Sequence, residues 1–95
     1  MYELTTSGKN CEKSSVVSTE NQCKQAAIEM SIKYKWTMNK VDRLAGCYKD
    51  ASTDGIYFNQ ITDPDQTNPL NDDKWRREKG MERFAAICIN NGKFC

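Results

Sequence analysis

Cysteine content constrains the fold of this chain more than any other feature. Five cysteines occur in 95 residues, and histidine is absent. No cysteine pair has the close spacing that structural zinc requires, so a zinc site is not favoured. Buried free thiols in a reducing cytosol are one alternative. The interpretation that the count favours is two disulfides formed in an oxidising compartment.

The chain has little apolar material for a core. Its hydrophobic fraction is 38%, and its mean hydropathy is −0.80. A single domain of this size, which we expect over residues 1–95, buries only about two thirds of the surface that its unfolded chain exposes. Disulfides across long loops would compensate, because the chain-entropy model assigns about 3–5 kcal/mol to each bridge.

A capped helix over residues 18–30 is the clearest local signal. It begins after Ser18 or Thr19, and Thr19 with Gln22 matches the reciprocal capping box. If the helical spacing is continued to residue 34, one face carries apolar residues that include two small alanines, and Ile28 and Ile32 fall on the opposite face. The first face consists of Cys23, Ala26, Ala27, Met30 and Tyr34.

Strand patterns occur on both sides of this helix. Residues 33–42 lose the helical pattern, although Trp36, Met38 and Val41 alternate like a short strand. The predicted strands are residues 2–5, 44–49, 55–61 and 84–89. The two middle strands are joined by Ser52-Thr53-Asp54-Gly55, which is typical of a hairpin turn. In the second hairpin strand, Tyr57 and Asn59 would share one face, and Ile56 and Phe58 the other.

Together these segments predict an α+β fold, in which one main helix packs on a small antiparallel β-sheet. The arrangement favours a Cys23–Cys47 disulfide between helix and hairpin, and a Cys11–Cys88 disulfide between the first segment and the last strand. A short second helix is expected after Asp72 or Asp73, with Gly80 as its stop. Cys95 is left over, either free or bonded to another chain.

This order of segments resembles that of small cysteine-rich modules in secreted or surface proteins of algae and other protists. More loosely, it is similar to the PAN/apple fold, in which a helix is disulfide-pinned to an antiparallel sheet. PAN/apple modules bind proteins or carbohydrates and are not enzymes, so the resemblance implies a binding module. It covers about residues 2–89, and its motifs are Cys11, Cys23-x-x-Ala26-Ala27, Gly46-Cys47-Tyr48, Tyr57-Phe58-Asn59 and Ile87-Cys88.

Composition argues against several function classes. The missing histidine removes the commonest general base, so we expect no enzyme, no catalytic residues and no cofactor. A net charge of +1 argues against nucleic-acid binding. No run approaches the roughly 18 apolar residues of a membrane-spanning helix, so membrane insertion is not expected.

The segment from residue 62 to residue 73 is rich in possible oxygen ligands for calcium. Its spacing fails the EF-hand pattern, because the central glycine and the glutamate at the last ligand position are missing. A solvated acidic surface loop is therefore favoured over a metal site. The oxygen-bearing side chains are Asp63, Asp65, Asn68, Asn71, Asp72 and Asp73.

Two groups of residues are candidates for binding. Ile28 and Ile32, if the loop over residues 62–73 or the tail does not cover them, would form an apolar stripe on the helix that docks a partner protein. Trp36 is assigned to the same partner-binding group, although it would also suit a cover for the thin core.

The second group would bind a glycan. Trp75 with Arg76 and Arg77 combines an aromatic ring with positive charge, which suits a sulfated sugar. The alternative is a solvated helix in which these charges complement neighbouring acids. Tyr48, Tyr57 and Phe58 are interpreted as hairpin core in preference to a ligand platform.

The main hypothesis is a non-catalytic extracellular or lumenal protein-binding or assembly module, a small subunit or domain that docks on a larger partner. The segment Met1-Tyr2-Glu3-Leu4 has no basic start and no apolar stretch, so no signal peptide is expected in this chain. The alternative is a secreted carbohydrate-binding module. A weaker alternative is an inhibitor or toxin-like secreted protein.

Overall fold

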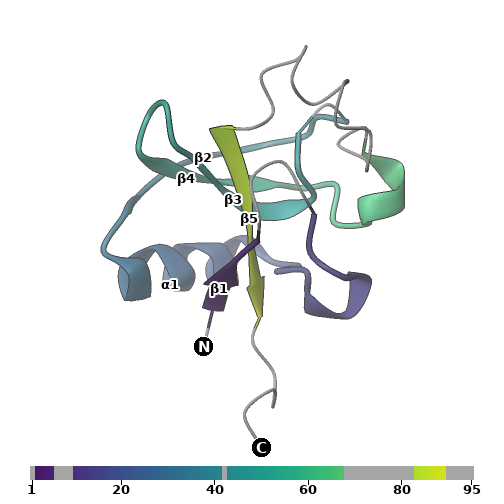
Figure 1. Cartoon of the computed structure of the whole chain (residues 1–95), viewed down its shortest axis with the longest axis horizontal. Helices are drawn as coiled ribbons and strands as arrows, with labels where there is room; N and C mark the ends of the chain where they lie inside the picture. Colours follow the sequence, from purple (N-terminus) through teal and green to yellow (C-terminus); the bar gives the residue numbers. More distant parts are fainter. Residues whose placement is uncertain (1, 6–9, 42, 68–82, 90–95) are drawn as a thin grey trace, which may run out of the picture.

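The computed structural model describes residues 2–5, 10–41, 43–67 and 83–89. One α-helix and five strands make up this part, and two short 3-10 turns lie in its connections (Figure 1). The strands are β1 (Tyr2–Leu4), β2 (Lys33–Met38), β3 (Gly46–Asp50), β4 (Gly55–Asn59) and β5 (Phe84–Ile89). The helix is α1 (Glu20–Met30), and the turns are η1 (Lys13–Ser15) and η2 (Pro64–Gln66).

The five strands form one sheet in the order β1-β5-β3-β4-β2. The predicted α+β fold, with one helix on a small sheet, is confirmed. The sheet differs from the expected antiparallel one in a single pair, because β2 runs parallel to β4. The tight hairpin makes β4 antiparallel to β3 and places it between β3 and β2. In that position, β4 runs in the same direction as β2.

The sheet separates two layers of buried side chains. We call the layer beneath α1 the helix-side core, and the layer on the other face the opposite core. The helix-side core consists of Val17, Cys23, Ala26, Ala27, Cys47, Ile56, Phe58 and Ile87. The opposite core consists of Cys11, Val16, Leu44, Tyr48, Tyr57, Phe84, Ala86 and Cys88. The predicted separation of Tyr57 from Ile56 and Phe58 is confirmed.

Each core layer contains one disulfide. Cys23–Cys47 joins α1 to β3 with 5.3 Å between the Cα atoms, and Cys11–Cys88 joins the N-terminal segment to β5 with 5.7 Å. Both bonds match the expected pairing. Since disulfides persist where thiols are not kept reduced, they suggest an oxidising compartment.

The start of α1 follows the predicted capping box, with one change. Thr19 Oγ1 accepts a hydrogen bond from the Gln22 N–H at 3.1 Å. The Gln22 side chain returns to the N–H of Ser18 at 3.3 Å, one residue earlier than in the standard box. Ser18 and Thr19 therefore both contribute to the cap, and the sequence pattern fits either residue as its start.

The end of α1 differs from the extended helical pattern. Ser31 adopts a left-handed conformation with φ 57°, and the Ile32 N–H donates to the Ala27 carbonyl. This is the usual way in which a left-handed residue ends a helix. The chain turns into β2 at this point, so Ile32 and Tyr34 lie outside the helix.

Gly46 allows β3 to begin close to the N-terminal segment. Its φ is +71°, which favours glycine, and a Cβ atom there would lie 2.6 Å from the Val17 carbonyl oxygen. With this close approach, Val16 lies in the opposite core and Val17 lies in the helix-side core. The short second helix expected after Asp72 or Asp73 lies outside the described residues.

Candidate functional site

The three residues predicted to bind a partner protein do not share a surface. Ile28 is 70% exposed on α1. Ile32 lies beyond the helix and packs, partly buried, against the helix-side core. Trp36, which is 57% exposed, contacts Tyr57 of the opposite core. The predicted Ile28–Ile32 stripe is therefore wrong, because the helix ends before Ile32.

Trp36 is presented by an irregularity in β2. Tyr34 pairs with Ile56 and Thr37 pairs with Phe58, so two residues of β2 lie opposite Tyr57 alone. This is the count of a β-bulge, which changes the direction in which side chains project. The sequence does not reveal the bulge, because Tyr34 and Trp36 would share a face in a regular strand.

The bulge places neighbouring side chains on the same face of the sheet. The Trp36 ring rests on Tyr57, and the Lys35 stem crosses the position that a Gly55 side chain would occupy. Lys33 is paired with Gly55, so it also belongs to this face. We call Lys33, Lys35 and Trp36 the Trp36 surface.

Three buried rings support the exposed ring of Trp36. Its centroid is 5.0 Å from that of Tyr57, in an edge-on arrangement. Tyr57 stacks on Tyr48 at 5.5 Å, and Tyr48 meets Phe84 edge-on at 5.2 Å. Burial raises the pKa of Tyr48 above its ordinary value. Tyr48 and Tyr57 therefore act as core, as the sequence favoured, and Trp36 is the exposed end of a row of rings.

Positive charge without an acidic partner gathers on and next to β2. In the described segments, Lys33, Lys35 and Lys40 form no ion pair. The other described lysines each have a carboxylate nearby: Lys13 pairs with Asp63 and Asp65, Lys24 with Glu20, and Lys49 with Asp54. The Trp36 surface is therefore aromatic and basic.

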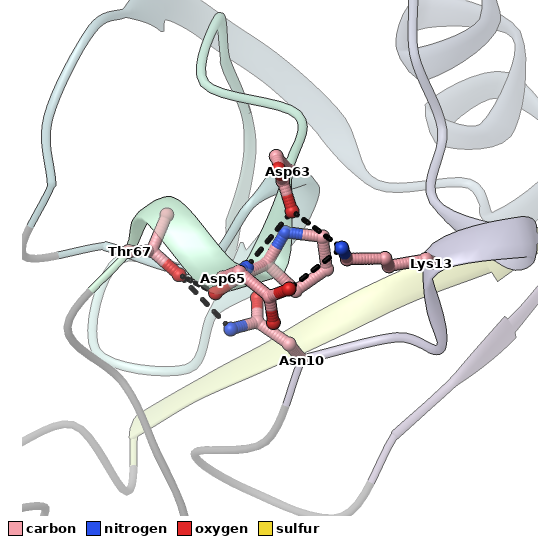
Figure 2. A network of polar contacts seen from close by, with 6 residues as sticks. Asn10, Lys13, Asp63, Asp65 and Thr67 are labelled. Atoms are coloured by element: carbon pink, nitrogen blue, oxygen red, sulfur yellow. Dashed lines mark hydrogen bonds and ion pairs between the residues drawn. The ribbon is translucent and has the colours of Figure 1, made fainter.

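A second polar site lies where η1 meets η2, on the right of the view in Figure 1 and away from α1. Figure 2 shows the Lys13 side chain directed at Asp63 and Asp65. Its Nζ is 2.6 Å from Asp65 Oδ2 and 3.7 Å from Asp63 Oδ1. Asp65 and Asp63 raise the pKa of Lys13, and the largest cause is the hydrogen bond that the Lys13 ammonium donates to the Asp65 carboxylate. Asn10 donates to the Thr67 hydroxyl at 3.0 Å beside them.

This second site is better explained as a structural connection than as a metal centre. A depression of about 210 Å³ adjoins it, lined by Lys13, Thr62, Asp63 and Pro64. The Lys13 ammonium already pairs with both of the carboxylates that calcium would need. In the part of the chain that the structure describes, no group of three or more metal-binding side chains is found.

Several predicted residues lie outside the described residues: Trp75, Arg76 and Arg77 of the expected glycan site, and Cys95. No helix among the residues with described positions is long and apolar enough to cross a membrane. Comparisons of the chain with protein-family models, curated proteins and solved structures find no match. The functional proposal therefore depends on the disulfides and on the geometry of the Trp36 surface.

Proposed function

We propose that this chain is a non-catalytic extracellular or lumenal module that docks on a larger partner protein through the Trp36 surface. The observation that carries the proposal is a tryptophan ring that is 57% exposed while packed edge-on against a buried tyrosine. Tryptophan is enriched among the residues that dominate binding energy at protein interfaces. A ring already held in place also loses little side-chain entropy when a partner covers it.

The remaining support is chemical. The absence of histidine from the sequence favours binding over catalysis, because the commonest general base is missing. The two disulfides favour an address outside the cytosol, where such bonds persist. A small domain with two cross-links and a rigid exposed ring suits a subunit that holds its shape while it docks.

The alternative is a carbohydrate-binding module. It is favoured by the same exposed ring, because Lys33 and Lys35 flank Trp36 and would attract the negative groups of an acidic or sulfated glycan. Trp36 in this case replaces Trp75 as the described aromatic candidate. The two alternatives are distinguished by whether a photoreactive group at position 36 forms a crosslink to a protein.

Site-specific photocrosslinking in extracts of the source organism tests the proposal. A photoreactive phenylalanine analogue at position 36 should form adducts with another protein, and the same analogue at position 28 should not. Position 28 is a matched control because Ile28 is also exposed and apolar, but lies on α1. Adducts at position 28 alone, or at neither position, would contradict docking through the Trp36 surface.

Glycan-array binding separates the alternative. If a carbohydrate is the ligand, Trp36→Ala should abolish array binding while position 36 yields no protein adduct. The Trp36→Ala protein should keep its unfolding midpoint within a few degrees, because the ring it removes is mostly exposed. A large fall in the midpoint would mean that Trp36 serves the core, as a cover for Tyr57.

A further inference from the structure

We infer that the partner contributes an acidic, extended segment, which adds as a further strand along the outer edge of β2. This inference rests on the proposed function, since it names the chemistry of the segment that docks. The occupant is a segment of another protein and not a second copy of this chain.

The first support is the place of β2 in the sheet. β2 is the last strand in the order, and β4 pairs with only one of its edges. An edge strand presents backbone N–H and C=O groups that an extended peptide pairs with in β-strand addition. With six residues, β2 is long enough to hold such a peptide.

The second support is charge. Lys33, Lys35 and Lys40 have no ion-pair partner in the described segments. In-register parallel pairing of β2 with a second copy, or antiparallel pairing centred on Tyr34, would set lysines against lysines, and edge lysines are a standard protection against self-association. The same lysines attract a strand that carries carboxylates. The nearby Glu20 does not cancel this charge, because it pairs with Lys24 at 2.9 Å.

The third support is the bulge. It interrupts the regular ladder between Tyr34 and Thr37, so the edge accepts a strand that is bent and not a flat, generic one. Trp36 projects at the interruption, where an apolar side chain of the incoming segment would contact its exposed ring. A segment that alternates acidic and apolar residues satisfies both requirements.

The test uses the folded, oxidised chain and synthetic peptides of about eight residues. The probe alternates glutamate and valine, and the comparison peptide replaces glutamate with lysine. Binding is followed by chemical-shift changes of the β2 backbone amides and by titration calorimetry. The acidic peptide should bind and shift the β2 amides, the basic peptide should not, and binding should weaken as salt rises from low to high concentration.

Variants locate the site. The double change Lys33→Gln/Lys35→Gln should weaken binding of the acidic peptide by about tenfold or more, since two charge contacts are lost. Trp36→Ala should weaken it to a similar degree. Lys13→Gln is the matched control, because it removes a lysine whose charge is already paired with Asp63 and Asp65 at the η1–η2 site, and it should leave affinity within about twofold.

Backbone methylation of the peptide distinguishes strand addition from simple charge attraction. Methyl groups on alternate backbone nitrogens should abolish binding, because they remove the donors of one edge. Undiminished binding of the methylated peptide, or equal binding of the basic peptide, would overturn the inference. If no peptide binds but position 36 still crosslinks to a protein, strand addition is wrong and the proposed function stands. If both fail, both are wrong.

Discussion

Replacement of Cys11 and Cys88 by alanine should lower the free energy of unfolding by about 4.5 kcal/mol. The two cysteines are 77 residues apart, so the bond removes more freedom from the unfolded chain than a short-range one. Replacement of Cys23 and Cys47, 24 residues apart, should cost about 3.5 kcal/mol by the same relation. Small domains have only roughly 5–15 kcal/mol in total.

Urea unfolding under oxidising conditions measures these changes. The Cys11/Cys88 variant should unfold at a lower midpoint than the Cys23/Cys47 variant, and a chain that lacks both bonds should be largely unfolded. A reductant supplies the control. It should shift the unfolding midpoint of the original chain toward that of the chain that lacks both bonds, and it should leave the midpoint of that variant unchanged. Equal midpoints with and without reductant would show that the bonds contribute nothing to stability.

Asn59→Asp should destabilise the fold by about 3–5 kcal/mol, although the two side chains have nearly the same shape. The Asn59 side chain is fully buried and uses all of its hydrogen-bonding capacity. Its amide nitrogen donates to the carbonyls of Lys40 and Leu44 at 2.7 and 3.0 Å. Its oxygen accepts from the N–H groups of Lys40 and Ile61 at 3.1 and 3.2 Å. Aspartate would lose both donations and bring a charge into the core.

Asn39→Asp is the matched control, because it makes the same chemical change at an exposed position. Its expected effect is within about 0.5 kcal/mol. Thermal unfolding should show a fall of more than about 12 °C for Asn59→Asp, given the sensitivity of a domain of this size. Similar melting temperatures for the two variants would mean that Asn59 does not hold the connection between β2 and β3.

Features set by neighbouring residues were predictable from the sequence. The Thr19–Gln22 cap depends on positions three apart, and the continuous apolar run from Phe84 to Ile89 identifies β5 with its observed bounds. The hairpin turn was also predictable, with Asp54 taking the positive φ of 52°. The disulfide pairing followed from the order of these elements, since it joins the helix to the hairpin and the first segment to the last strand.

Features that depend on distant contacts were not predictable. The Ile28–Ile32 stripe failed because Ser31 adopts a left-handed conformation, which serine rarely signals in a sequence. The parallel pairing of β2 follows from where β4 fits in the sheet, and the bulge hides the true faces of Tyr34 and Trp36. The role of Asn59 was also not predictable, because its side chain bonds to the backbone of Lys40 and Leu44, which are distant in the sequence.

Two specific disulfides hold this small α+β domain together, and tryptic mapping of the unreduced native protein detects them. Cleavage after lysine and arginine places all five cysteines in separate peptides. We expect peptide 10–13 to be linked to peptide 84–93, and peptide 14–24 to peptide 44–49. Unlinked peptides, or links between other pairs, would contradict both the architecture and the oxidising compartment.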